Sequence, residues 1–399
     1  MAMSERRYEI SSSGIENRKL VLTWGDGHRS SFHPMWLRHQ CECADCGTSL
    51  DAIRGVRLHH IPDDIAPLSA EATGNGVTIV WNGGGHVSTY SAKWLRDHCY
   101  SEDERALRRS RPVLWTGSLS PVPTFDYGQM QSDPAVRLSM LKAVRDTGFC
   151  KVTGVPPEKA HASSFIELVG PQRQTHYGTY DLASKKSTDN VGDTSGPLDP
   201  HTDETYRLSS IGITVFQVMR PSSNGGASTL VDGFEAARRL REAAPDDFDL
   251  LTRLPITTQR LDRGANSGGQ QRWFVARLPV IKLDFEGEIA GVRLNERQIA
   301  PLDIPAELIG PCYRALKKIF ELVYEPELRL TFPLEAGEGL IFDNQRCLHG
   351  RTGYVPETPP RSVLTSSVDL EEFHSTLRTL EMATGKTGPQ MLYAQGINV

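Results

Sequence analysis

The run IGITVFQV at residues 211–218 is a short apolar segment rich in β-branched and aromatic side chains, which is the composition of a buried strand. Further strand-like runs occur at residues 149–153, 228–231, 274–280, 328–332, 339–342 and 362–368. Helical patterns are fewer and occur at residues 135–146, 234–243 and 306–324. Many strands with few helices predict a mainly β fold, a barrel or jelly roll with flanking helices on its outside.

The first hundred residues contain an internal repeat. The first copy is LVLTWGDGHRSSFHPMWLRHQC at residues 20–41, and the second is VTIVWNGGGHVSTYSAKWLRDHC at residues 77–99. Each copy has a β-rich run that ends in Trp, a glycine-containing turn, a His, a second short strand and then Trp-Leu-Arg and a Cys. Two similar hairpins predict a small β-rich N-terminal domain at residues 1–105. A charged and then proline-rich stretch predicts a linker at 106–125, and a larger domain follows at 126–399.

Composition places the chain among ordinary globular proteins. Of its 399 residues, 38% are hydrophobic and 23% are charged, and the formal net charge is −5. Interspersed charges with an acidic balance argue against a nucleic-acid partner. No run of ~18 apolar residues is present for a membrane span. The N-terminal segment lacks the apolar run of a secretory signal, so we expect a cytoplasmic protein.

Three of the seven cysteines stand within six residues, as Cys41, Cys43 and Cys46. Thiolates at this spacing can share one tetrahedral Zn²⁺, which requires a fourth ligand from elsewhere. From spacing alone the candidates for the fourth ligand are His28, His59, His60, His86, His98 and Cys99. A site with four protein ligands is closed, so we expect its role to be structural. Packed free thiols or redox chemistry are the alternative interpretations.

A second pattern of chemical interest is Pro200-His201-Thr202-Asp203. On a strand or at its end, His201 and Asp203 share one face because side chains alternate. A distant His349 can complete the two-histidine, one-carboxylate site of non-heme Fe(II) oxygenases, which leaves positions open for a cosubstrate and O₂. Arg361 follows at the start of another strand, where its guanidinium can clamp a carboxylate through two hydrogen bonds. Without the distal His and Arg, the tripeptide alone indicates only a surface pair.

These motifs occur together in one known family. The chain resembles the γ-butyrobetaine hydroxylase and trimethyllysine dioxygenase family, whose members are Fe(II)- and 2-oxoglutarate-dependent oxygenases of the taurine dioxygenase superfamily. WLRHQCECADC at residues 36–46 is similar to the family's WLRDNCxCxxC zinc motif, and Gly85-His86 is similar to the segment that carries its fourth ligand. PHTDETY, GGASTLVDGF and FDNQRCLHGRTGY, at residues 200–206, 225–234 and 342–354, match further family motifs in the same order.

The resemblance implies a fold, a set of ligands and a chemistry. The implied fold is a double-stranded β-helix, or jelly roll, behind a small zinc-binding domain, assembled as a homodimer. It implies Fe(II) on His201, Asp203 and His349, and structural Zn²⁺ on Cys41, Cys43, Cys46 and His86. 2-Oxoglutarate would chelate the iron and pair with Arg361, and Ser228 is a further candidate contact. O₂ and 2-oxoglutarate, as cosubstrates, would be converted to succinate and CO₂ while an unactivated C–H bond is oxidised.

The pocket that the family uses for a trimethylammonium group is only partly kept in this sequence. Butyrobetaine enzymes hold this group in an aromatic cage by cation–π attraction. Tyr180 stands where the family has Trp, and His176 where it has Tyr. Asp193 and Ser367 replace two further cage tyrosines, and Tyr206 can supply a replacement ring. Fewer aromatic rings and one added carboxylate still suit a cation, although not in the same cage.

The opposite end of the substrate is expected to be anionic. Asn190 matches a family residue that contacts the substrate carboxylate, and Asn295 lies near the family's second Asn contact. Arg293 and Arg297 flank Asn295, and arginine suits a phosphonate at least as well as a carboxylate. We therefore expect a small zwitterionic quaternary-ammonium substrate, with 2-(trimethylammonio)ethylphosphonate slightly preferred and γ-butyrobetaine, the precursor of carnitine, as the family alternative.

Two other outcomes are compatible with the sequence. The same site could desaturate its substrate or migrate a methyl group, because these reactions share the initial oxidation. A non-enzymatic zinc protein that keeps the fold as a scaffold is disfavoured by the complete set of His201, Asp203, His349 and Arg361.

Overall fold

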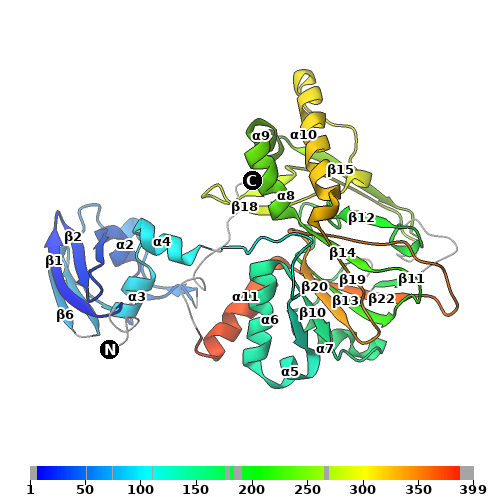
Figure 1. Ribbon diagram of the computed structural model, residues 1–399. Coiled ribbons are helices and arrows are strands. Elements are labelled where there is room, and N and C mark those ends of the chain that lie inside the picture. The colour runs from blue at the N-terminus through cyan, green and yellow to red at the C-terminus, as the bar shows by residue number, and fades with distance from the viewer. Residues whose placement is uncertain are drawn as a thin grey trace. The chain divides into compact units, whose positions relative to one another are not determined.

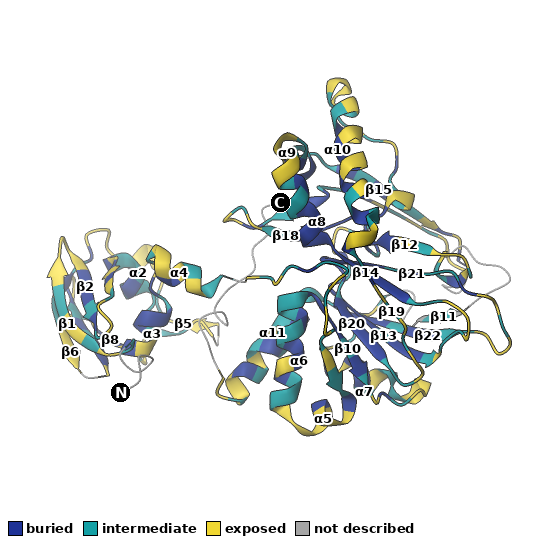
Figure 2. Cartoon of the chain, in the orientation of Figure 1, coloured by how far each residue is buried: buried dark blue, intermediate teal, exposed yellow. Residues whose placement is uncertain are grey.

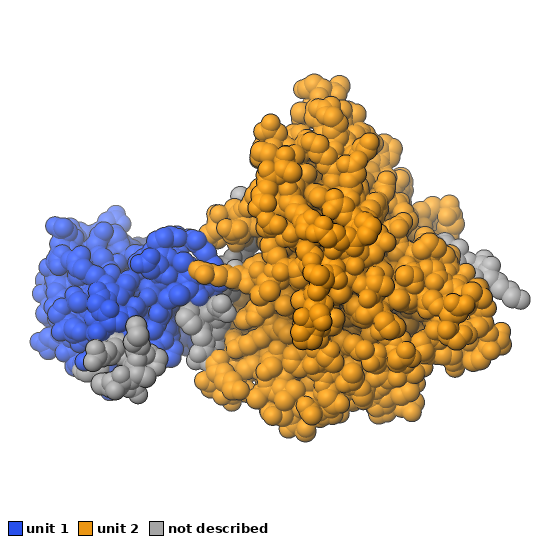
Figure 3. Space-filling model, in the orientation of Figure 1, with its two compact units in different colours: residues 1–110, 388–393 blue, residues 111–387, 394–399 orange. Residues whose placement is uncertain are grey.

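The structure is a computed structural model, and it describes residues 7–50, 52–73, 75–109, 111–175, 180–183, 191–264 and 269–386. The chain divides into two compact units (Figure 3), and within the described residues the first ends at Arg109 and the second begins at Arg111. Residues 111–125, which the sequence assigns to a linker, are counted in the second unit. Trp115 is buried there, and its indole Nε1 donates to the carbonyl of Thr147 at 2.7 Å.

The first unit contains two similar three-stranded sheets, each of which adds a third strand to one of the hairpins that the internal repeat predicts. The indole of Trp24 donates to Ser30 Oγ at 2.8 Å, and the indole of Trp81 donates to Ser88 Oγ at the same distance. Both tryptophans are buried in one shared core. The strands are β1 (Ile10–Glu16), β2 (Lys19–Trp24) and β3 (Arg29–Phe32), then β6 (Pro67–Thr73), β7 (Gly76–Trp81) and β8 (Val87–Ser91), with a short pair β4 (Gly47–Thr48) and β5 (Ile53–Arg54). The helices are α2 (Pro34–His39), α3 (Ala92–Asp97) and α4 (Glu102–Arg108), with a 3₁₀ turn η1 (Leu58–His60).

The second unit has a double-stranded β-helix core, which confirms the predicted fold class (Figure 1). Its larger sheet has the order β11-β22-β13-β20-β10-β9 and its smaller sheet the order β12-β21-β14-β19. Phe149 and Phe342 of the larger sheet pack against Leu230 and Leu330 of the smaller one, so the two sheets face each other across an apolar interior. The strands are β9 (Thr124–Asp126), β10 (Phe149–Thr153), β11 (Tyr180–Ala183), β12 (Leu198–His201), β13 (Ile213–Arg220), β14 (Ser228–Asp232), β19 (Arg329–Phe332), β20 (Gly339–Asp343), β21 (Cys347–Arg351) and β22 (Ser362–Val368).

Helices cover the outer faces of both sheets, and Figure 2 shows that their buried sides face the strands. On the larger sheet, Ile213 and Val215 pack against the helices, because alternate residues of a strand point to opposite faces. The covering helices there are α5 (Tyr127–Ser132), α6 (Pro134–Thr147), α7 (Ala162–Ile166) and α11 (Leu370–Ala383). The smaller sheet is covered by α8 (Gly233–Ala243), α9 (Pro245–Arg253) and α10 (Ala306–Tyr324). Within the described residues, none of the helices is both long enough and apolar enough to cross a membrane.

One predicted strand has a different place in the fold. The apolar run at 274–280 belongs mostly to β16 (Arg272–Leu278), which pairs only with β15 (Ile256–Asp262) as a separate hairpin. Trp273 and Val275 of this strand are exposed, because one face of the hairpin has no sheet to cover it. A second small pair, β17 (Ile281–Leu283) and β18 (Ile289–Val292), follows it.

Candidate active site and metal centres

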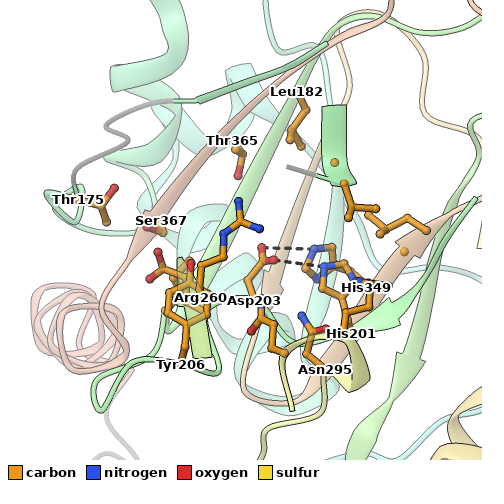
Figure 4. Close-up of a pocket in the computed structure, with 18 of the residues that line it drawn as sticks. Thr175, Leu182, His201, Asp203, Tyr206, Arg260, Asn295, His349, Thr365 and Ser367 are labelled. Carbon is orange, nitrogen blue, oxygen red and sulfur yellow. Dashed lines mark ion pairs between the residues drawn. The ribbon is translucent and has the colours of Figure 1, made fainter. Parts of the chain in front are cut away.

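His201 and His349 lie on adjacent strands of the smaller sheet. Strand β12 ends at His201, which is paired in register with His349 of β21, and the centroids of the two rings are 4.4 Å apart. Asp203 follows β12, and its Oδ1 and Oδ2 lie 3.3 Å from His201 Nε2 and 3.4 Å from His349 Nε2 (Figure 4). One ligand atom from each of the three residues therefore lies within 4.8 Å of the other two.

The electrostatics of this group suit a divalent cation. Burial lowers the pKa of His349 to about 3, so its imidazole is neutral at physiological pH and keeps a lone pair for a metal. Burial alone would raise the pKa of Asp203, but His349, His201 and the charge of Arg297 outweigh it and hold the pKa below its ordinary value. His201 Nδ1 lies 2.9 Å from the carbonyl of Asp199, a contact that orients the ring with Nε2 toward Asp203.

The loop that carries Asp203 is held by side chains from other elements. Asn344 is fully buried, and its Oδ1 accepts from the Asp203 amide at 2.8 Å while its Nδ2 donates to the Asp203 carbonyl at 3.2 Å. The Thr202 amide donates to the carbonyl of Leu294 at 2.7 Å, and the Leu294 amide donates back to Thr202 Oγ1. Bonds to both sides of Thr202 and Asp203 give this loop a fixed geometry.

The three residues line a cavity of about 750 Å³, a size typical of small-molecule sites. The lining includes His201, Asp203, His349, Arg361, Ser228, Tyr206, Asn295, Arg297, Ser367, Arg351, Arg260, Arg263, Phe216 and Trp273. The side chains come from both sheets, from the loop after β12, from the β15–β16 hairpin and from the segment after β18.

Arg361 presents a guanidinium to this cavity, and we find no acidic partner for it among the residues that the structure describes. Burial and the neighbouring charge of Arg351 lower its pKa to about 10, so it stays charged at neutral pH. Arg351, in contrast, donates to the backbone carbonyls of Gly192 and Gly196, each at 3.1 Å. Ser228 is paired in register with Arg351 and is buried at the same end of the cavity. Arg361 is therefore a cation available for a bound carboxylate.

The structure brings three of the predicted substrate contacts to the cavity. Tyr206 is buried against Phe274, with ring centroids 5.6 Å apart, and lines the cavity together with Asn295, Arg297 and Ser367. Asn295 Nδ2 donates to the carbonyl of Thr202 at 3.2 Å, and its Oδ1 is buried without a hydrogen-bond partner.

Two predicted contacts have another environment. Arg293 is buried, donates to the backbone carbonyls of Thr205 and Arg207, and does not line the cavity. Asp193 is fully buried outside the lining, where its charge acts on Arg351. Arg293 was expected to bind the anionic head of the substrate. Its guanidinium instead binds backbone carbonyls, and it holds the loop after Asp203.

Asn190 and His176 lie outside the described residues. Tyr180 begins β11, but its side chain is outside the description as well.

The sequence did not predict the contribution of the β15–β16 hairpin. Gln259, Arg260 and Leu261 from β15 and Trp273 from β16 line the cavity. Figure 4 shows Arg260 in the same part of the cavity as Asp203 and Tyr206. The pair Arg272-Trp273 was the available signal in the sequence, but nothing there indicates which side of the hairpin faces the barrel.

The first unit gathers Cys41, Cys43, Cys46 and His86 into a second cluster. His86 Nε2 lies 3.4, 3.8 and 3.7 Å from the sulfur atoms of Cys41, Cys43 and Cys46. A tetrahedral zinc ion with Zn–S bonds of ~2.3 Å and Zn–N bonds of ~2.05 Å separates sulfur from nitrogen by about 3.5 Å. The donor types and their distances therefore fit zinc, and burial lowers the pKa of His86, which favours the neutral imidazole that a metal needs.

The other candidates for a fourth ligand are elsewhere. His28 and Cys99 lie beside each other, His98 stacks on Trp94, and His59 and His60 are in the turn η1. Of the described candidates, only His86 is grouped with the three cysteines.

Comparison with known proteins identifies the same two parts. Residues 113–366 match the family model "Taurine catabolism dioxygenase TauD, TfdA family", and residues 13–96 match "Gamma-butyrobetaine hydroxylase-like, N-terminal". The chain is 32% identical to a gamma-butyrobetaine dioxygenase of Pseudomonas sp. (strain AK-1) over 90% of its length and 93% of that protein. It is 28% identical to a trimethyllysine dioxygenase of Meyerozyma guilliermondii over 95% of its length and 98% of that protein.

Proposed function

Because the chain belongs to the taurine catabolism dioxygenase TauD, TfdA family, and is a dioxygenase, we propose that it uses Fe(II) and 2-oxoglutarate to oxidise a small zwitterionic trimethylammonium compound. The observation that carries this proposal is the convergence of His201, Asp203 and His349 in one cavity with Arg361. Two imidazoles and one carboxylate are a donor set typical of non-heme Fe(II).

Each group in the cavity has a task in this proposal. His201, Asp203 and His349 would hold Fe(II), and Arg361 would bind the distal carboxylate of 2-oxoglutarate, with Ser228 beside it. When bound, Fe(II) and 2-oxoglutarate would allow O₂ to oxidise a C–H bond of the substrate, with release of succinate and CO₂. The buried Asn344 and the bonds around Thr202 keep the Asp203 loop in position, and the apolar rings of Phe216 and Phe342 exclude water from one side of His349.

The class of substrate is proposed from the relatives and from the cavity together. The two relatives described above are named for γ-butyrobetaine and trimethyllysine, both of which carry a trimethylammonium group. In this chain the buried ring of Tyr206 supplies a π surface for such a cation, supported by its stacking on Phe274. Ser367 leaves room in the cavity where the family has a larger cage tyrosine.

The charge of the cavity favours a substrate with a strongly anionic head. Its described lining contains five arginines, Arg260, Arg263, Arg297, Arg351 and Arg361, against the two acids Asp203 and Glu204. Glu204 is already paired with Arg207 at 2.8 Å, and Asp203 is needed for a metal. A phosphonate carries more negative charge than a carboxylate and offers three oxygens to guanidinium groups. On this ground we prefer 2-(trimethylammonio)ethylphosphonate, with Arg297 as the candidate contact.

The test is a comparison of three substrates with the purified protein in air, Fe(II) and 2-oxoglutarate. We expect 2-(trimethylammonio)ethylphosphonate to give the highest kcat/KM, above γ-butyrobetaine and trimethyllysine, with succinate and product measured by mass spectrometry. A much higher value for γ-butyrobetaine would refute the phosphonate preference and leave the oxygenase proposal intact. If none of the three compounds supports succinate formation, the proposed substrate class is refuted.

Structural Zn²⁺ on Cys41, Cys43, Cys46 and His86 is the second part of the proposal. The 3.4–3.8 Å separations of His86 from the three sulfur atoms support it. The homodimer and the cytoplasmic location stay predictions from the sequence.

A further inference from the structure

The internal repeat of the first unit extends further than the two hairpins. When the two copies are aligned on Trp-Leu-Arg-x-x-Cys, the metal-cluster segment Cys41-x-Cys43-x-x-Cys46 falls on Cys99-x-Ser101-x-x-Glu104. The hairpin histidine of the second copy, His86, falls on His28 of the first. The metal cluster therefore combines the cysteines of the first copy with the histidine of the second.

The reciprocal combination is also present in the structure. His28 of the first copy meets Cys99 of the second, with 3.6 Å between Nε2 and Sγ, compared with 3.4 Å for His86 and Cys41. Ser101 Oγ lies 3.4 Å from the same His28 nitrogen, where Cys43 Sγ lies 3.8 Å from His86. Ser101 is the N-cap residue of α4, yet its hydroxyl makes no cap hydrogen bond and contacts His28 and Cys99 instead.

The fourth ligand position, Cys46 in the first copy and Glu104 in the second, also corresponds, but its chemistry differs. In the metal cluster, Arg38 donates to Cys46 Sγ at 3.3 Å. Arg96, its counterpart, donates through Nε to Glu104 Oε1 at 2.9 Å. Arg96 and Glu104 are each about 97% buried, and Arg96 also binds Asp26 while Glu104 also binds Arg7.

The two corresponding sites cross-link the first unit by different chemistry. A metal ion held by Cys41, Cys43, Cys46 and His86 would tie the loop 41–46 to the hairpin of the other copy. At the second position, Arg96 ties the loop after Cys99 to the turn at Asp26, which belongs to the hairpin of the other copy. The bond from Arg96 to Asp26 is bidentate, with distances of 3.1 and 2.8 Å, and this geometry is the strong form of an arginine–carboxylate pair.

We infer that His28, Cys99, Ser101 and Glu104 form the pseudo-symmetric counterpart of the metal cluster, where the buried Glu104–Arg96–Asp26 ion network replaces the ion. The site retains the backbone frame and two of the four ligands of a zinc site. It therefore takes a thiophilic divalent cation of the zinc class once thiolates stand at positions 101 and 104. Residues of the catalytic cavity take no part, so the inference does not depend on the proposed substrate.

The first test is a gain of metal. The full-length double variant S101C/E104C should purify with two zinc ions per chain, whereas the unaltered protein should carry one. Adding His28→Ala to the double variant should return the ratio to one, because the second ion then loses its nitrogen ligand. A double variant that folds and still binds a single zinc would overturn the inference, as would a second zinc that does not need His28.

The second test does not depend on folding of the double variant. Glu104→Gln leaves Arg96 and Arg7 short of a buried charge partner, so the folding equilibrium constant of the unit should fall about 100-fold or more. Glu102→Gln is the matched control, because Glu102 is 68% exposed and pairs with Arg105 and Arg109 of the same segment. Equal chemical-denaturation midpoints for the two variants would show that Glu104 is not a cross-link and would overturn the inference.

Discussion

Replacing Arg361 by Met should separate cosubstrate binding from every other property of the protein. Met keeps much of the length of the side chain but removes the guanidinium. Arg361 and Arg351 are two cations in close electrostatic contact, and Arg351 is already engaged with backbone carbonyls. A carboxylate of 2-oxoglutarate would therefore lose its strongest partner when Arg361 is removed.

The size of the effect follows from the burial of the pair. Loss of one partner of a desolvated, charge-assisted pair costs roughly 2–5 kcal/mol, which is about 30-fold to several thousandfold in affinity. The pKa of Arg361, lowered to about 10, still leaves the group charged at pH 7.5, so the whole charge is lost in the variant. Arg361→Lys should lose less, because it keeps the charge but not the planar pair of donors.

The assay is anaerobic calorimetric titration of the Fe(II)-loaded protein with 2-oxoglutarate. Arg297→Met is the control for removal of a cavity charge, and it should leave this affinity unchanged. A Kd for Arg361→Met within about threefold of the unaltered protein, less than ~1 kcal/mol, would refute the assignment of Arg361.

Three further predictions address other parts of the molecule. Cys43→Ala should lose zinc and lower the unfolding midpoint of the first unit, because structural zinc energy is folding energy; a variant with full zinc content and unchanged midpoint would contradict the cluster. Arg297→Met should raise KM for the phosphonate more than for γ-butyrobetaine, and equal effects on both would argue against a contact with the head group. Burial and the charge of Arg293 lower the pKa of Lys282 from 10.5 to about 8. Between these values the unfolded chain binds more protons at Lys282 than the folded one, so the unaltered protein should gain up to about 3 kcal/mol over Lys282→Met as the pH rises from 8 to 10.5. Urea unfolding across this range that shows a constant difference would contradict the shift.

The sequence was sufficient for residues whose positions follow from a motif on a regular strand. His201 and His349 could be predicted because strand pairing brings His-x-Asp and the distal His together. The cysteine loop was predictable for a similar reason, since its ligands are close in the chain. Choosing His86 needed the family resemblance, because His28 has the same position in the other copy of the repeat.

Contacts that depend on tertiary packing could not be predicted. Arg293 and Arg297 look equivalent in the sequence, but the loop after β18 directs Arg293 into backbone carbonyls and places Arg297 at the cavity. The β15–β16 hairpin contributes Arg260 and Trp273 because of its position over the barrel, which no local pattern encodes. Asn344 could be recognised as part of a motif, although the two hydrogen bonds between its side chain and the Asp203 backbone were visible only in the structure.

The most direct test of the central claim is the fate of labelled oxygen. We predict that, with ¹⁸O₂, Fe(II), 2-oxoglutarate and a trimethylammonium substrate, one labelled atom enters succinate and one enters the hydroxylated product. Asp203→Ala should form neither compound while it keeps its zinc and its unfolding midpoint, because Asp203 is assigned to the iron and not to the fold. Succinate without label, or undiminished turnover by a folded Asp203→Ala variant, would contradict the account.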